Sequence, residues 1–583
     1  MRFELRVKNW QSYIPIVDVV KRYRRRDFNH DLIAGIIVGV ITVPQAMAYA
    51  LLAGLPAQAG LYACLVPMAI YAVLGSSKQL AVGPVAITAL MVAAAVGQYA
   101  PRYGGDYLGI TAALSLQAGI ILLLLRLSQM GGLVNLLSHP VIVGFVNAAA
   151  ILIIISQIGP FTGIPSSGGA EPVSQLLALG RSLDALNPVT LGIGLASLAL
   201  LLLVQQYAAP MLFVAGRRWR LRVTRDHPIS RVGPVLVTVL AALAVALWHL
   251  DGDYGVAVVG LVPSGLPSFT RPPFDPQMWR DIAPSAAMIA VVAYVESYSI
   301  GASLATRQRT RINSHQELIA LGAANIGAAF TGAYPVAGSF SRSGVNFQTG
   351  ARSQIASLIC MGVILLTLLF FTPLFARLPT AALAAIVVVS VLGIVDFRSI
   401  RRHWAVYRED SITELVTLAT VLFFGVETGL ITGVALSIAF FVRKSSRPHI
   451  VIVGRIPHTE HFRSARRYDV ETFPHVAAIR IDENLYFGNA NQVENKLLKI
   501  IQRRPGTRHV LLVCSAVNLI DISGLEMLYR VNQTFDAMGV KLHLAEVKGP
   551  VMEQLEASDF VMKLTGSVFF TTDQAMRDLA ERA

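Results

Sequence analysis

Long apolar stretches follow one another along the first 445 residues of the chain. Many run for about 20 residues almost without charge, which is the length that a helix needs to cross the hydrocarbon core of a bilayer. The pattern therefore predicts a polytopic α-helical membrane protein with fourteen transmembrane (TM) segments, two of them short. We place these segments at 31–52, 57–75, 84–98, 108–127, 134–157, 187–206, 232–249, 283–304, 316–332, 341–350, 355–374, 380–395, 411–427 and 429–442.

The pattern changes after residue 447, where short apolar strands alternate with helices. Such alternation predicts a small α/β domain. We expect strands at 475–481, 509–517 and 541–547, and helices at 490–502, 523–538, 550–556 and 573–579. The chain is therefore divided into a basic N-terminal segment (1–30), a transmembrane domain (31–447), a linker (448–465) and the α/β domain (466–583).

Basic residues gather on one side of the expected membrane domain. The cluster Lys21, Arg22, Arg24, Arg25 and Arg26 precedes the first segment, and positive charge marks the cytoplasmic side. Alternate loops agree, because the expected inner ones carry most of the arginines: 217–231, 307–311 and 398–408. We expect a multi-pass protein of the cell (inner or plasma) membrane with both termini cytoplasmic and no cleavable signal peptide in residues 1–30.

Composition changes this picture little. The chain is 54% hydrophobic and 14% charged, and its formal net charge is +14. Because the basic residues flank apolar segments and lack interleaved aromatics, anionic lipid headgroups are the simpler partner and nucleic acid is not expected. Cys64, Cys360 and Cys514 have no disulfide or metal-ligand spacing, and no nucleophile–base set is visible. We therefore expect neither an enzyme nor a cofactor.

One stretch inside the membrane domain, 334–348, is neither apolar nor long enough to span. Pro335 and Gly338 discourage a continuous helix, and Ser339 and Ser341 are capable caps for a half-helix that starts near Arg342. Free N–H groups at a half-helix start, together with a guanidinium, favour an anion. The alternative is a charged loop at the membrane surface.

A matching break lies in the first half of the chain, at 80–88. There an extended run leads to Gly83 and Pro84 and then to a short apolar helix, with Pro84 suited to its first turn. Each break lies about 50 to 55 residues after the start of a spanning segment, 31–52 in one half and 283–304 in the other, as inverted repeats require. Two half-helices would then direct their N–H groups at one point.

Three polar residues lie within those two spanning segments. Gln45 and Tyr49 are four residues apart and so lie on one helical face. There the amide and the phenol can donate hydrogen bonds to an oxyanion. The alternative is that both side chains serve helix packing. Glu296 lies in the middle of its segment, and an intramembrane carboxylate is costly unless it is paired or protonated. It is either a proton-coupling group or a permanent ion pair with Arg342. Glu414 and Glu427 rank lower, because they lie near predicted segment ends that reach the headgroups.

These residues belong to motifs that resemble the SulP anion transporters (solute carrier family 26), and the resemblance covers nearly the whole chain. The matching motifs are VPQAMAYA at 43–50, GLP at 54–56, GLY at 60–62, GSS at 75–77, VGPVA at 82–86, GSFSR at 338–342, VNF at 345–347 with Gly350, and DISG at 521–524. The resemblance implies a seven-plus-seven inverted-repeat fold like that of uracil transporters, with a core domain that moves against a gate domain, and a cytoplasmic STAS domain. It also implies a homodimer.

The resemblance further implies roles for individual residues. It places the anion site at Gln45, Tyr49, Ala86, Ser339, Phe340, Ser341 and Arg342. It places proton coupling at Glu296. The amino-acid sequence around Ser339 is similar to that of proton/sulfate symporters. We therefore expect secondary active transport, with proton-coupled sulfate uptake favoured. A bicarbonate or dicarboxylate transporter is the alternative, and an anion channel or a sensor with STAS output is a further one.

The STAS resemblance singles out Ser523, which matches a serine phosphorylated in anti-sigma-factor antagonists. A phosphate there would lie at a helix start. Ile522 departs from the Ser or Thr that those proteins often have, so helix capping by Ser523 is favoured over regulation. Whether the domain binds a regulator stays open.

Overall fold

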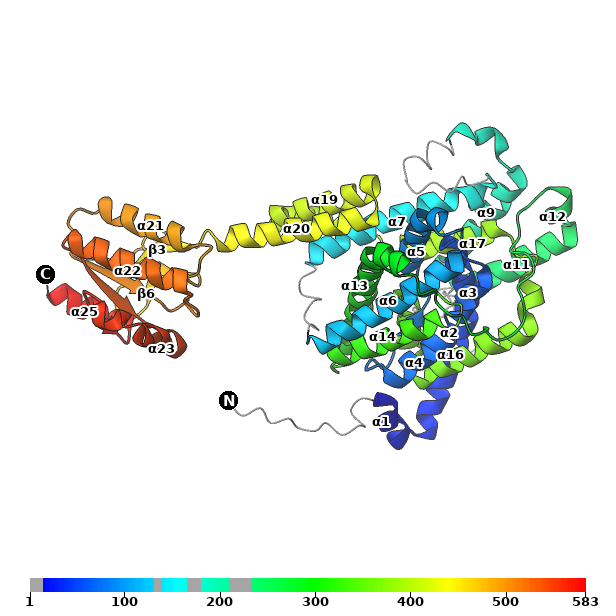
Figure 1. Ribbon diagram of the computed structural model, residues 1–583, viewed down its shortest axis with the longest axis horizontal. Helices are drawn as coiled ribbons and strands as arrows, with labels where there is room; N and C mark the ends of the chain where they lie inside the picture. The colour runs from blue at the N-terminus through cyan, green and yellow to red at the C-terminus, as the bar shows by residue number, and fades with distance from the viewer. Residues whose placement is uncertain (1–13, 130–137, 165–179, 209–231, 583) are drawn as a thin grey trace. The chain divides into compact units, whose positions relative to one another are not determined.

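The structure is a computed structural model that describes residues 14–129, 138–164, 180–208 and 232–582. It separates the chain into two compact units that meet between Val434 and Ala435 (Figure 1). The first unit is helical and the second contains a sheet, as the change of sequence pattern predicted.

Among the described residues, nine helical stretches are long and apolar enough to cross a membrane. They are Arg25–Leu52 (α2), Ala57–Leu74 (α3 and α4), Tyr107–Leu127 (α6), His139–Thr162 (α7), Pro188–Tyr207 (α9 and the π-helix η5), Pro276–Arg307 (α13), Ile355–Phe375 (α16, η7 and η8), Thr380–Val406 (α17 and α18) and Val426–Ser445 (α20). The other expected segments are shorter helices: Ala86–Tyr99 (α5), Gly233–Trp248 (α11), Ser314–Ala329 (α14), Phe340–Thr349 (α15) and Arg408–Phe424 (α19). The membrane-protein fold is confirmed, and the count of fourteen crossings stays a prediction.

Several boundaries differ from the expected ones. Helix α13 begins at Pro276, seven residues earlier than predicted, because Asp275 caps it and Pro284 is accommodated inside it. Helix α7 begins at His139, and residues 134–137 of its predicted start lie outside the described residues. The basic segment before the first crossing predicts an amphipathic entry helix at 15–28; the structure has a shorter helix, Pro15–Arg22 (α1), because a new helix, α2, begins at Arg25.

The helices of the first unit pack in two groups. We call α2–α6 and α13–α16 the core helices, because α14 packs on α6 and α4, α13 on α6, and α16 on α2 (Figure 1). We call α7, α9, α11, α17 and α19 the gate helices, since α17 packs on α7 and α9, and α19 on α7. Backbone contact in the core group is close, because a Cβ at Gly119 of α6 would lie 2.7 Å from the carbonyl oxygen of Gly322 in α14.

Two extended pieces cross in the middle of the core helices. Val82–Gly83 (β1) pairs antiparallel with Ala337–Gly338 (β2), with Val82 opposite Gly338 and Gly83 opposite Ala337. Each piece leads into a half-helix, α5 or α15, as the Gly/Pro breaks predicted. The prediction that Pro84 lies in the first helical turn is wrong: α5 begins at Ala86, and Pro84 precedes it in the non-helical connection.

The second unit contains a six-stranded sheet of order β4-β3-β5-β6-β7-β8 with a parallel part from β5 to β8. Its strands are Ile450–Arg455 (β3), Phe462–Ser464 (β4), Val476–Ile481 (β5), His509–Val513 (β6), Lys541–Ala545 (β7) and Val568–Phe569 (β8). Its helices are Ala490–Gln502 (α21), Ile522–Ala537 (α22), Gly549–Ala557 (α23), Phe560–Lys563 (α24) and Thr572–Glu581 (α25). The segment 448–465, expected as a linker, holds β3 and β4 and so belongs to the sheet.

Candidate functional site

A cavity of about 570 Å³ lies where β1 and β2 lead into α5 and α15. Core helix α2 lines one part of it, and gate helices α9, α11 and α17 line another. All eight membrane residues predicted for the site line this cavity: Gln45, Tyr49, Ala86, Glu296, Ser339, Phe340, Ser341 and Arg342. The structure therefore brings together, at one place, residues that lie up to 297 positions apart in the chain.

Both half-helices begin at the cavity wall. Ala86 is the first residue of α5 and Phe340 the first of α15, and both line the cavity. The first N–H groups of a helix have no partner within it, and they carry the positive end of the helix dipole. Ser339 caps α15, since its side chain accepts from the N–H of Arg342. Two helix starts at one cavity make a site that favours negative charge.

Arg342 brings a full positive charge to the same place. Its side chain is 1% exposed, and Nη2 donates to the carbonyl oxygen of Pro84 at 2.7 Å. Nη1 and Nε are buried without a protein partner. The guanidinium lies against β1, because a Cβ at Gly83 would be 3.3 Å from both Nη atoms. Part of the hydrogen-bonding capacity of this cation is therefore left for a ligand.

Glu296 supplies the negative group of the cavity. It is half-buried, and its Oε2 is buried without a hydrogen-bond partner. Glu296 and Arg342 are both described, and the permanent ion pair that the sequence left open does not form between them. Among the described residues that line the cavity, Arg342 is the one cation and Glu296 the one acid. A carboxyl group in that position can take up and release a proton.

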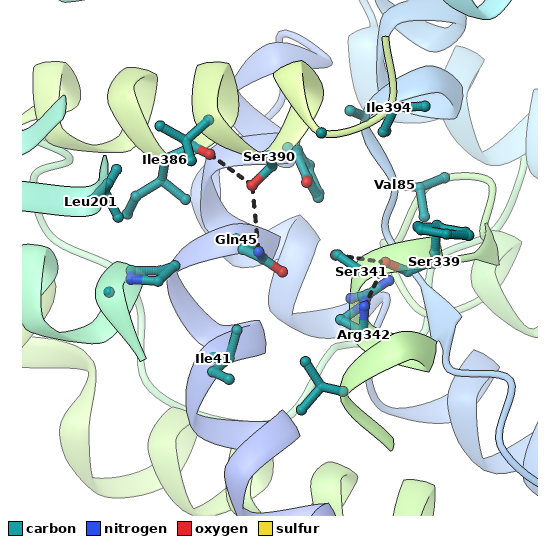
Figure 2. A pocket seen from close by; sticks show the side chains of 18 of the residues that line it. Ile41, Gln45, Val85, Leu201, Ser339, Ser341, Arg342, Ile386, Ser390 and Ile394 are labelled. Carbon is teal, nitrogen blue, oxygen red and sulfur yellow. Dashed lines mark hydrogen bonds between the residues drawn. The ribbon is translucent and has the colours of Figure 1, made fainter. Parts of the chain in front are cut away.

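Gln45 connects the core helices with the gate helices. Its Nε2 donates to Ser390 Oγ of α17 at 3.5 Å, and Ser390 in turn donates to the carbonyl oxygen of Ile386 at 2.7 Å. Figure 2 shows Gln45 and Ser390 on one side of the cavity, with Ser339, Ser341 and Arg342 on the other. The sequence pattern identified Gln45, but it gave no sign that Ser390 is its partner.

Three polar residues that were not predicted hold the extended pieces in place. Ser297 Oγ accepts from the N–H of Gly338 at 2.7 Å and donates to the carbonyl oxygen of Ala293. Asn325 pairs with Val336 in both directions, at 2.9 and 3.1 Å. Ser343 Oγ accepts from the N–H of Ala81 at 2.9 Å. For Ser297 and Asn325 the available signal was a hydroxyl or an amide within a mostly apolar helix, whereas Ser343 lies in the polar half-helix α15.

The two carboxylates that ranked lower both have partners within the protein. Glu414 is 0% exposed and contacts Ser399 and His403, so it is kept inside the protein. Glu427 is half-buried and accepts from Ser285.

Ser523 belongs to the second unit. The prediction that Ser523 caps a helix is wrong, because α22 begins one residue earlier and Asp521 caps it, with Oδ1 accepting from Gly524 N at 2.8 Å. Ser523 is half-buried in the first turn, and Ile522 beside it is 77% exposed. Its regulatory role stays a prediction.

Comparisons with known proteins agree with this geometry. Residues 28–417 match the sulfate permease family, and residues 467–575 match the STAS domain. The chain is 34% identical to sulfate transporter 4.1, chloroplastic, of Arabidopsis thaliana, over 97% of this chain and 82% of that protein. It is 33% identical to a probable sulfate transporter of Mycobacterium tuberculosis, over 98% and 99% of the two chains.

Solved structures support the fold. The murine solute carrier 26 family member A9, an anion transporter in the inward-facing state, matches with a TM-score of 0.89 at 23% identity, over 100% of this chain and 96% of that one. The transmembrane domain of the cyanobacterial bicarbonate transporter BicA matches 70% of this chain and 98% of that one, with a TM-score of 0.59 at 22% identity. These comparisons confirm the expected family, and with it a transporter rather than an enzyme. The chain therefore belongs to the sulfate permease family, with a STAS domain at its C-terminal end.

Proposed function

We propose that this chain takes up sulfate together with protons, through movement of the core helices against the gate helices. The observation that carries the proposal is the cavity itself, where two half-helices begin beside Arg342 and Glu296. Sulfate is a dianion whose four oxygens accept many hydrogen bonds. The helix N–H groups, the Ser339 hydroxyl and the free N–H groups of Arg342 match that demand.

Glu296 gives the cavity a means of coupling. When Glu296 is ionised, its charge opposes the entry of a dianion, and protonation removes that opposition. Binding of the proton and binding of the anion therefore favour each other, because coupling between two sites is reciprocal. After release of both on the other side, return of the empty core helices completes one transport cycle.

The proposed transport function also bears on the location and orientation of the chain in the membrane. We infer a cell (inner or plasma) membrane location with the amino terminus and the STAS domain in the cytoplasm. Two of the cavity-lining residues lie beside the expected inner loop: Gln205 in η5, which continues α9, and Gly233 at the start of α11. The cavity then extends toward the cytoplasmic ends of these helices. We also infer a homodimer, as the family resemblance implies.

The test is uptake of radiolabelled sulfate into proteoliposomes with an inward proton gradient imposed or withheld. Wild-type protein should accumulate sulfate only with the proton gradient. Glu296→Gln should lose this accumulation but should still transport sulfate down a sulfate gradient. Gradient-driven accumulation by Glu296→Gln would overturn the coupling role. Competition with unlabelled bicarbonate and dicarboxylates in the same vesicles separates sulfate from the alternative anions of this fold.

A further inference from the structure

Helix α18, Phe397–Val406, is turned the opposite way from most surface helices. A surface helix normally packs its apolar face on the protein and exposes its polar face. Here Ser399 is 4% exposed and His403 is half-buried, whereas Phe397 is 49% exposed and Trp404 is 47% exposed. The polar face is therefore turned toward the protein, and the aromatic side chains are turned away from it.

A buried carboxylate fixes this orientation. Glu414 of α19 accepts from Ser399 Oγ at 2.9 Å and lies 3.0 Å from His403 Nδ1. At the start of the helix, Asp396 exchanges two hydrogen bonds with the side chain of Asn147 in α7, at 2.9 and 3.1 Å. Helices α7 and α19 lie side by side (Figure 1). Together their side chains hold α18 at these two points. Hydrogen bonds, rather than apolar burial, therefore determine which face of α18 is turned toward the protein.

The outward face carries aromatic and basic residues together. Phe397, Ile400 and Trp404 share one face, because they are spaced three and four residues apart. The arginines beside that face, together with Arg408 at the start of α19, are exposed: Arg398, Arg401, Arg402 and Arg408. In the described part of the chain, none of these four arginines has an ion-pair partner. The acidic residues nearby are Asp396, which caps the helix, and Glu409, Asp410 and Glu414 of α19.

We propose that α18 lies in the interface of the bilayer and binds anionic phospholipid headgroups. It follows directly on α17, within a stretch whose length and composition suit a membrane crossing, and it leads into α19. Its aromatic face would enter the acyl boundary, and its arginines would reach the lipid phosphates. Tryptophan is common at this depth, because its ring is apolar and its N–H is polar.

A second copy of this chain fits the face less well than a bilayer does. A two-fold interface places the same patch of each subunit against itself. Four arginines would then face four arginines, and like charges in contact oppose association. An anionic lipid surface matches both the charge and the exposed aromatic side chains.

The first test follows Trp404 in the full-length protein. The other tryptophans, Trp10, Trp219, Trp248 and Trp279, are replaced by Phe, and the variant is placed in nanodiscs of phosphatidylglycerol brominated either near the headgroup or deep in the acyl chain. Fluorescence of Trp404 should be quenched more by the shallow bromines than by the deep ones, and acrylamide should quench it weakly. Quenching by acrylamide alone would show a face exposed to water. Absence of quenching by any of the three agents would show a face covered by protein, and either result overturns the proposal.

The second test needs no tryptophan substitution. Retention of phosphatidylglycerol and phosphatidylcholine by purified protein is measured by native mass spectrometry for wild type and for a triple variant, Arg398→Gln, Arg401→Gln and Arg402→Gln. Each basic residue near an anionic surface strengthens binding about fivefold. In the triple variant, the ratio of retained phosphatidylglycerol to phosphatidylcholine should therefore fall at least about tenfold. The matched control removes three exposed arginines of the STAS domain, Arg463→Gln, Arg466→Gln and Arg467→Gln, and should keep the preference. Equal losses in both triple variants would show that only net charge matters, and would overturn the site.

Discussion

Arg342 is a buried cation whose partners within the chain satisfy only part of its side chain. A buried charge is costly unless it is paired and hydrogen-bonded. One N–H reaches Pro84, while Nη1 and Nε have no partner among the described residues. An anion at the starts of α5 and α15 would supply the missing acceptors. The incomplete pairing of Arg342 therefore supports the proposed anion site.

The Arg342→Lys substitution tests whether Arg342 binds the anion. Lysine keeps the charge, but it cannot bind Pro84 and an anion together with the planar fork of arginine. A hydrogen bond to a charged group contributes about 1.5–3 kcal/mol, so the concentration of sulfate for half-maximal uptake should rise about tenfold or more. Arg352→Lys is the matched control, since Arg352 is half exposed, pairs with Asp27 at 3.1 Å and does not line the cavity. Equal changes in the two variants would contradict the role of Arg342.

Ser297 provides a second prediction about a single side chain. Ser297→Ala would leave the buried N–H of Gly338 without its acceptor, which costs about 1–3 kcal/mol. The midpoint of thermal unfolding in detergent should fall, and the register of β2 should loosen. Ser299→Ala in the same helix should change little, because Ser299 is exposed. If Ser297→Ala unfolds at the same midpoint temperature as the wild type, another group accepts the hydrogen bond from the N–H of Gly338.

The residues that could be predicted from the sequence are those whose type is unusual for their place. Gln45, Glu296 and Arg342 interrupt apolar segments, and an intramembrane polar group is functional by default. Ser390 and Asn325 could not be assigned in this way. Hydroxyls and amides also satisfy backbone groups within a helix, and Ser390 meets Gln45 across 345 positions of sequence. Only the packing of α17 on α2 makes that pair visible.

At the scale of elements, the two half-helices were predictable because glycine and proline break helices locally. The breaks at Gly83 and Pro84 and at 335–338 predicted an extended piece before each half-helix, but the pairing of β1 with β2 joins distant parts of the chain and was not predicted. The start of α5 at Ala86 was missed because Pro84 takes another role: its carbonyl oxygen accepts from Arg342. The sheet position of β3 and β4 was missed as well. The apolar run at 450–453 was a signal for β3, which pairs with β5, whereas β4 pairs only with β3 and has no such run.

Two strands of the STAS domain carry histidines whose protonation opposes folding. His543 Nδ1 accepts from the N–H of Ser567 at 2.9 Å, so its Nε2 carries the hydrogen and donates to His509 Nδ1 at 3.1 Å. Burial lowers the pKa of His543 to about 4, and it also lowers the pKa of His509. The positive charges of Lys541 and Arg582 act in the same direction on His543. Both rings are therefore neutral when they hold β6 and β7 together.

The sign of the pH dependence follows from that pKa. An unfolded histidine takes its proton near pH 6.5, whereas folded His543 resists protonation down to about pH 4. Between these values the unfolded state binds more protons, so the free energy of unfolding of the STAS domain should fall as the pH drops. Hydrogen exchange of the β7 peptide in full-length protein, corrected for intrinsic rates, should accelerate from pH 7 to pH 5. His543→Gln should show a smaller acceleration, and an equal acceleration in both proteins would exclude His543 as the cause.

At the scale of the whole membrane unit, transport needs the core helices to move against the gate helices. The hydrogen bond from Gln45 to Ser390 joins the two groups across the cavity, with α2 on the core side and α17 on the gate side. At 3.5 Å between Nε2 and Oγ it is a long bond, and a single long bond is easily broken. The structure therefore places a weak contact at the boundary where the proposed motion must occur.

A covalent bridge at that boundary should stop transport. With Gln45→Cys and Ser390→Cys, a short bifunctional thiosulfonate should join α2 to α17, abolish sulfate uptake, and restore it after reduction. The native cysteines are buried and so interfere little. The matched control pairs Ser390→Cys with Leu201→Cys, because both residues line the same cavity but lie on gate helices that pack together. Its bridge fills the cavity to a similar extent without joining core to gate, so it should leave most of the uptake. Uptake that survives the Gln45–Ser390 bridge would rule out relative motion of the two groups, and loss in both pairs would show that the reagent merely blocks the cavity.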